Sequence, residues 1–243
     1  MRLTFKASCS KELAFTSSNE DKFEFNSAES LFALSDGASE SYNSKLWAKI
    51  LVKNFVKTPI KELSSIEECI KEYEANEIVS SLSWSKQLAY ERGSFATLLG
   101  VEYLPQSATV NILAIGDSLA LLVDDGRVVE SWPFTSPDSF LLKPTLLSSR
   151  RDYNLFVSEN DFIVKNTKAF CLSGLKNPLL LCMTDAIGEW TLKGMIAENN
   201  NLSRLCDLTS TRSFFEIVIQ ERHAKRMKID DTTLVKFSFN EVL

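Results

Sequence analysis

Four short acidic motifs, spread along the chain, constrain the fold most strongly because three of them adjoin apolar runs. The motifs are Asn19-Glu20-Asp21, Ser35-Asp36-Gly37-Ala38, Thr184-Asp185-Ala186 and Asp230-Asp231-Thr232-Thr233. Apolar runs at 31–34 and 179–183 precede Asp36 and Asp185, and a third run at 234–237 follows Asp231. Runs of this length are typical of buried strands. Carboxylates at the ends of such strands can therefore converge on one point.

Carboxylates that converge on one point need a compensating charge. Their mutual repulsion raises the pKa of each group, and a hard divalent cation with oxygen ligands is the usual remedy. We therefore predict a Mg²⁺ or Mn²⁺ site that is rich in carboxylates and assembled from distant segments. A single surface Asp is more often a turn or cap residue, so the prediction depends on the motifs taken together.

The composition limits the classes of protein to which the chain can belong. Its 243 residues are 44% hydrophobic and 24% charged, which suits one large globular domain over 1–243. The net charge of −5 argues against nucleic acid or an anionic membrane as the main partner. No stretch approaches the roughly 18 apolar residues of a membrane span, and the first residues lack the apolar core of a signal peptide. Five cysteines without a CxxC spacing favour a reducing, cytoplasmic setting.

The hydrophobic periodicity predicts an α+β fold. An apolar stripe at Leu46, Ile50, Leu51 and Phe55 indicates a helix over 44–57. Other helical patterns cover about 65–91, 186–197, 202–207 and 211–223. Strand-like runs occupy 3–8, 23–25, 31–34, 95–103, 109–115, 119–123, 128–132, 161–171, 179–183 and 232–239. Because strands and helices occur in blocks, we expect antiparallel sheets covered by helices and not a doubly wound parallel sheet.

Six motifs, taken in their order along the chain, resemble the metal-dependent protein phosphatases of type 2C. They are Asn19-Glu20-Asp21, Asp36-Gly37, Gly93-Ser94-Phe95-Ala96-Thr97-Leu98-Leu99-Gly100, Gly116-Asp117-Ser118, Thr184-Asp185 and Asp230-Asp231-Thr232-Thr233-Leu234. Each motif alone is common by chance, but together they cover 19–237 in the family's order. The segments 131–134 and 184–190 are more similar to a compact bacterial branch. The resemblance implies a four-layer sandwich, with two antiparallel sheets flanked by helices on both sides and a binuclear metal centre at one end.

The resemblance also implies which residues hold the two metals. Asp36 corresponds to the carboxylate that bridges them, and Gly37 to the residue whose backbone carbonyl binds one of them. Asp185 and Asp230 correspond to the other carboxylates on the first metal. With Asp36 they are the residues that catalysis would require.

Further acidic residues have correspondences around that centre. Glu20 and Asp21 match an acidic pair that binds a metal directly or holds its waters. Asp117 matches a residue that helps to bind a weaker third metal in some relatives. Asp231 stands where relatives often have Asn, so we expect it beside the ligands and not among them.

The implied activity is hydrolysis of phosphoserine or phosphothreonine in proteins, with Mn²⁺ or Mg²⁺ as cofactor. Two ions can share one water and lower its pKa, and the resulting hydroxide attacks phosphorus in line. This chemistry needs no side-chain nucleophile, which agrees with a chain whose one histidine, His223, lies in a basic helix end. A phosphorylated protein substrate and a cognate serine/threonine kinase are the expected partners.

The sequence departs from the family pattern around the substrate phosphate. It has Thr16 for a phosphate-binding Arg, Ala38 for a His, Leu119 for an Arg and Ala186 for a Gly. Arg150, Arg151 and Lys11 are candidates to replace the missing Arg. The departures leave open a metal-binding relative of low activity that serves as a partner-binding or sensing module. The complete ligand set favours an enzyme, since carboxylates without a metal are costly. Another two-metal hydrolase such as a nuclease is disfavoured by the acidic charge.

Overall fold

The computed structural model describes residues 1–78 and 82–239 and contains two five-stranded sheets within them. The strands of the first sheet are, in spatial order, β1 (Arg2–Cys9), β12 (Thr232–Ser238), β11 (Leu179–Met183), β7 (Leu119–Asp124) and β8 (Arg127–Trp132). Those of the second are β10 (Thr167–Cys171), β6 (Thr109–Ile115), β5 (Leu98–Leu104), β3 (Leu31–Ser35) and β2 (Lys22–Asn26). Every pairing in both sheets is antiparallel. A short pair, β4 (Phe95–Ala96) with β9 (Leu147–Ser148), forms a separate two-stranded sheet next to the start of β5.

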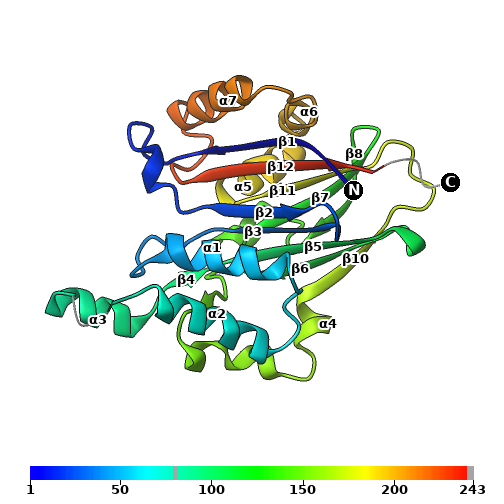
Figure 1. The fold of residues 1–243 in the computed structure, drawn as a ribbon. Coiled ribbons are helices and arrows are strands. Elements are labelled where there is room, and N and C mark those ends of the chain that lie inside the picture. The colour runs from blue at the N-terminus through cyan, green and yellow to red at the C-terminus, as the bar shows by residue number, and fades with distance from the viewer. Residues whose placement is uncertain (79–81, 240–243) are drawn as a thin grey trace.

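Helices cover the outer faces of the two sheets (Figure 1). On the second sheet lie α1 (Ser44–Phe55), α2 (Leu63–Ala75) and the short α4 (Phe162–Asn166), and α3 (Trp84–Arg92) follows α2. On the first sheet lie α5 (Asp185–Ile196), α6 (Asn201–Cys206) and α7 (Thr211–His223). Short 3₁₀ turns are η1 (Thr16–Ser18), η3 (Pro105–Ser107), η4 (Pro137–Leu141) and η5 (Arg151–Ser158). No helix of the described residues combines the length and apolarity that crossing a membrane requires.

The apolar residues of each strand alternate between two cores, and this alternation fixes the layers. In β3, Phe32 and Leu34 point between the sheets, whereas Leu31 and Ala33 pack under α1. β7 does the same in the first sheet, where its odd-numbered residues pack against α5 and α7. Strands with both faces buried are continuously apolar, which is why the runs were recognisable. The predicted four-layer α+β sandwich is confirmed.

Three of the predicted elements differ from the structure. The strand expected over 95–103 is two strands, β4 and β5, which belong to different sheets. The helical pattern over 65–91 is two helices, α2 and α3, and its residues 79–81 lie outside the described residues. Serines at 83 and 85, which favour caps and turns over helix interiors, accompany this break. The strand expected over 161–171 begins as α4, where Lys165 pairs with Asp161 at 2.8 Å and Phe162 is buried. Only its second half, β10, is a strand.

Candidate active site

The register of the strands brings the acidic motifs to one end of the sandwich. In the first sheet Met183 pairs with both Leu119 and Leu234, so Asp117, Asp185 and Asp230 leave their strands at the same edge. In the second sheet the end of β3 lies beside the start of β5. Asp36 follows β3, and its backbone N–H donates to Oγ1 of Thr97 at 2.9 Å. Residues as far apart in the sequence as Asp36 and Asp230 therefore meet at this end of the sandwich.

A small cavity of about 150 Å³ lies where the motifs meet. It is lined by Asp36, Gly37, Ala38, Ser39, Thr97, Asp117, Pro144, Leu146, Asp185 and Asp230. The structure thus brings together five of the seven residues that the sequence analysis assigned to metal binding. The other two do not line the cavity, but Glu20 accepts a hydrogen bond from Ser39, which does, and Asp21 accepts one from Thr184, the neighbour of Asp185.

Gly37 allows the close approach of these segments. A Cβ atom on Gly37 would lie 3.0 Å from the backbone carbon of Ser44 and 3.1 Å from Cβ of Glu20. Contacts this short would displace the first turn of α1 or the Glu20 side chain. Glu20 itself accepts hydrogen bonds from Ser44 and Ser39, so a larger residue at 37 would disturb one connected group.

The crowding of carboxylates raises several pKa values. Burial, followed by the charges of Asp21, Asp185, Asp117 and Asp230, holds the pKa of Asp36 well above its usual value. Burial and the Asp185 charge raise the pKa of Asp117 to about 6. Burial also raises the pKa of Asp185, against the opposing effect of Lys228. The cluster therefore holds protons at a pH where isolated carboxylates are ionised.

Asp21 is buried and incompletely hydrogen-bonded. Its Oδ2 accepts hydrogen bonds from Thr233 at 2.6 Å and Thr184 at 3.2 Å. Its Oδ1 has no hydrogen-bond partner among the described residues. Burial raises the pKa of Asp21 to about 7, with a further contribution from the Asp231 charge. A buried oxygen without a partner is costly, and a bound cation or a water that it holds would satisfy it.

Two lysines supply positive charge to the carboxylates. Lys228, which the sequence analysis did not single out, contacts Oδ2 of Asp185 and lies 3.1 Å from Oδ2 of Asp230. Lys11 lies 2.9 Å from Oε2 of Glu20. The position of Lys228, two residues before Asp230, was the one sequence signal that could have identified it.

A buried arginine and a buried aspartate hold the segments that carry the site. Arg222 donates to the backbone oxygen of Ser10 and to Oγ1 of Thr232, each at 2.9 Å, and to the backbone oxygen of Asp230. Asp231 accepts hydrogen bonds from the backbone N–H groups of Lys11 and Glu20, each at 2.7 Å. Asp231 thus binds backbone, in the supporting position expected for it. Arg222 belongs to the basic helix end that also carries His223, but it is buried whereas His223 is exposed.

The candidates for a replacement phosphate-binding residue are engaged elsewhere. Arg151 pairs with Glu67 at 2.6 Å, and neither it nor Arg150 lines the cavity. Arg150 packs over the ring of Tyr90 at 4.2 Å and lies 3.7 Å from Glu74. Lys11 is close to the cavity but is paired with Glu20. Thr16 lies exposed in η1. The hypothesis that Arg150 or Arg151 binds the phosphate is therefore not supported by their positions.

The donors present fit hard divalent cations, although the side chains are not arranged as a finished metal site. Among residues 1–78 and 82–239, no three His, Cys, Asp or Glu side chains form a group ready to hold an ion. The reason is local, since Asp185 and Asp230 turn to Lys228 and Asp21 turns to two threonines. The all-oxygen donor set, the raised pKa values and the unsatisfied Oδ1 of Asp21 nevertheless agree with Mg²⁺ or Mn²⁺.

Comparison with known proteins finds this fold among phosphatases. No family model and no curated protein matches the sequence. The photosystem II phosphatase PBCP superposes with a TM-score of 0.61 at 12% identity, covering 98% of this chain and 99% of its own. Stp1, a serine/threonine phosphatase from Staphylococcus aureus, gives 0.59 at 12%, with coverage of 99% and 98%. The catalytic domain of the serine threonine protein phosphatase PstP, solved with two manganese ions, gives 0.57 at 15%, with coverage of 98% and 99%. The chain has the fold of the type 2C serine/threonine phosphatases.

Proposed function

We propose that the chain is a metal-dependent phosphoserine/phosphothreonine protein phosphatase, with residues 1–243 forming one catalytic domain. The observation that carries the proposal is the convergence of Asp36, Asp117, Asp185 and Asp230 on one cavity. They come from four separate parts of the chain, at one end of a fold that serine/threonine phosphatases share. Nothing in the packing of an ordinary core requires four carboxylates to meet, because like charges destabilise one another.

The chain's own residues would bind and orient the reacting groups. Asp36, Asp185 and Asp230, with the carbonyl of Gly37, would hold two Mn²⁺ or Mg²⁺ ions, supported by Glu20 and Asp21. Such ions, when bound, activate water and neutralise charge on the phosphoryl oxygens. Asp117 lines the same cavity and would help to hold a weaker third ion.

The surrounding hydrogen bonds would keep these ligands in position. Thr97 fixes the backbone at Asp36, and Arg222 fixes the backbone at Asp230. Asp231 ties the segments of Lys11 and Glu20 to the start of β12. Supporting contacts of this kind orient metal ligands and govern affinity. A phosphorylated protein is the substrate that we propose, and a cognate serine/threonine kinase is its natural counterpart.

One observation favours a second candidate, a relative of low activity that binds a partner or senses a signal. Lys228 already neutralises Asp185 and Asp230, and no arginine lines the small cavity among the described residues. A metal-binding relative in which Lys228 weakens the binding of the ions and no arginine holds the substrate phosphate would keep its fold with little hydrolysis of phosphate esters. The two candidates differ in whether bound Mn²⁺ supports hydrolysis.

Hydrolysis of p-nitrophenyl phosphate and of a phosphothreonine peptide, with Mn²⁺ or with chelator, tests the proposal. We expect hydrolysis that depends on Mn²⁺ and is lost in Asp36→Asn. Mn²⁺ binding without hydrolysis of either compound would support the second candidate. A melting temperature indifferent to Mn²⁺, Mg²⁺ and chelator would contradict the metal site in both.

A further inference from the structure

A second, much larger cavity adjoins the carboxylate cavity. Its volume is about 900 Å³, near the upper end of the roughly 300–1,000 Å³ typical of ligand pockets. The two cavities share Ala38, Pro144 and Leu146 as lining residues. A molecule that places one group among the carboxylates can therefore extend into the larger cavity without leaving the protein surface.

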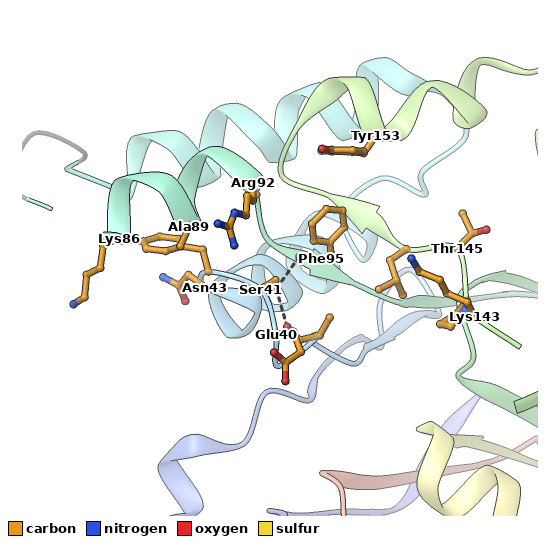
Figure 2. Close-up of a pocket in the computed structure, with 15 residues that line it drawn as sticks. Glu40, Ser41, Asn43, Lys86, Ala89, Arg92, Phe95, Lys143, Thr145 and Tyr153 are labelled. Carbon is orange, nitrogen blue, oxygen red and sulfur yellow. Dashed lines mark hydrogen bonds between the residues drawn. The ribbon is translucent and has the colours of Figure 1, made fainter. Parts of the chain in front are cut away.

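The walls of the larger cavity come from several segments that hydrogen bonds hold together (Figure 2). The segment 38–43 is fixed to β4 because Ala38 donates to the carbonyl of Phe95 at 2.9 Å and Phe95 donates to Oγ of Ser41 at 3.1 Å. The rings of Phe95 and Tyr153 meet edge to face at 5.5 Å. A preformed wall of this kind lowers the conformational cost of binding.

The charges around this cavity are mostly positive. Lys86 and Arg92 lie along α3 at one side, and Lys143 lies on the loop at the other side (Figure 2). None of the three pairs with a carboxylate among residues 1–78 and 82–239. Glu40 is the one acidic residue among the described residues that line it.

This arrangement differs from that of several nearby cations. The chain carries a net charge of −5, so an excess of cations in the composition does not explain why these three lie around one cavity. Nearby Lys11, Arg150, Arg151 and Lys228 each have a carboxylate within 4 Å, whereas the cations at the larger cavity do not. Unpaired cations around an apolar cavity are complementary to a ligand that carries negative charge beside apolar groups.

We propose that the larger cavity binds the polypeptide around the phosphorylated residue and selects segments with Asp or Glu close to that residue. The proposal rests on the proposed function, because the phosphorylated side chain is what would enter the small cavity. Lys86, Arg92 and Lys143 pair with the acidic side chains, and the rings of Phe95 and Tyr153 contact the apolar parts of the segment.

The test compares three short peptides that contain one phosphothreonine, flanked by Asp, by Asn or by Lys. Exposed ion pairs are individually weak, so we expect kcat/KM to be roughly threefold to tenfold higher for the Asp peptide than for the Asn peptide. High salt should reduce this ratio. In the triple variant K86Q/R92Q/K143Q the ratio should fall to about one. Lys176→Gln, an exposed lysine at the far end of β11 from Asp185, removes a charge elsewhere and should retain the ratio.

A binding measurement separates this inference from the proposed function. Fluorescence anisotropy with a labelled Asp peptide that carries no phosphate reports on the larger cavity without hydrolysis. Hydrolysis of all three peptides with equal kcat/KM would overturn the inference and leave the phosphatase intact. Selective binding of the Asp peptide, lost in the triple variant and without any hydrolysis, would support the acidic-segment site and contradict the phosphatase. Absence of both would overturn both.

Discussion

The ammonium nitrogen of Lys228 lies 3.1 Å from Oδ2 of Asp230, and the same nitrogen contacts Oδ2 of Asp185. These two carboxylates raise the pKa of Lys228 above its usual value, although its burial acts in the opposite direction. One side chain of the protein thus supplies a positive charge at the place where the proposed function requires metal ions. Lys228 and a divalent cation would compete for the same oxygens.

This competition predicts the behaviour of Lys228→Met. Without the lysine, Asp185 and Asp230 face each other without compensation, so the metal-free variant should lose about 1 kcal/mol of stability. The same change removes a competitor, so Mn²⁺ should bind more tightly. Melting temperatures in chelator and in Mn²⁺, with calorimetric titration of Mn²⁺, measure the two effects.

Lys225→Met is the matched control. Lys225 lies, like Lys228, in the connection between α7 and β12, is exposed, and makes no ion pair among the described residues. It should change neither quantity. An unchanged Mn²⁺ affinity in Lys228→Met would show that Lys228 does not occupy the metal-binding oxygens.

Asp36→Asn should separate the fold from the chemistry. Four neighbouring carboxylates repel a negative charge on Asp36. Replacing it by the neutral Asn should therefore leave the metal-free protein as stable as the wild type or more so. If Asp36 bridges two ions, Mn²⁺-dependent hydrolysis should nevertheless fall by at least about a hundredfold. The experiment compares melting in chelator with hydrolysis in Mn²⁺. A variant that keeps most of its activity would refute the assignment of Asp36.

The raised pKa values predict how pH affects the metal-free protein. Asp21 and Asp117 have pKa values of about 7 and about 6 in the fold, against an ordinary value of 3.8. The folded state therefore binds more protons than the unfolded chain between these limits, so stability should fall as pH rises from about 4 to about 7. For Asp117 alone, the shift from 3.8 to about 6 corresponds to a loss on the order of 3 kcal/mol.

Urea denaturation in chelator at about pH 5 and about pH 7.5 measures this dependence. Glu20 does not interfere, because hydrogen bonds from Ser39, Ser44 and Lys11 lower its pKa and its effect lies below its ordinary value of 4.5. Asp117→Asn should flatten the profile. A metal-free protein that becomes more stable over this interval would contradict the electrostatic account.

The hydrogen bonds of the buried Arg222 predict that its loss lowers both stability and metal affinity. Its guanidinium holds the carbonyls of Ser10 and Asp230 and the hydroxyl of Thr232. Charge-assisted hydrogen bonds contribute about 1.5–3 kcal/mol each, so Arg222→Met should lower the free energy of unfolding by at least about 2 kcal/mol. Mn²⁺ affinity should also fall, because the backbone at Asp230 loses its anchor. Arg212→Met, on the exposed face of α7, should affect neither.

Sequence patterns could predict the parts of this protein that depend on local order. β3, β11 and β12 have both faces buried, and their apolar runs predict them as buried strands. The order of the acidic motifs located the residues that line the small cavity. The pattern is insufficient where packing decides between a helix and a strand. α4 is an example, because its sequence has the apolar run of a strand.

The partners of the charged side chains could not be predicted, because they depend on distances across the fold. Lys228 lies 43 positions from Asp185 in the chain, and no local pattern connects the two. Arg222 looked like part of an exposed basic helix end but is buried against β1 and β12. Arg151 was a candidate for the phosphate, yet it pairs with Glu67 on α2. Such contacts follow from tertiary packing, which sequence periodicity does not encode.

The altered phosphate contact gives the last prediction. Thr16 stands where many relatives of the resembled family have an Arg, and it is exposed in η1, four residues before Glu20. An arginine there displaces no buried group, and a charge-assisted contact to phosphate would lower KM for p-nitrophenyl phosphate by about tenfold. Arg151→Gln should leave that KM unchanged, since Arg151 is held by Glu67 away from the cavity. Steady-state kinetics in saturating Mn²⁺ test both variants. A KM that rises in Arg151→Gln would show that Arg151 contributes to phosphate binding. A KM that Thr16→Arg does not lower would show that a side chain at position 16 does not reach the bound phosphate.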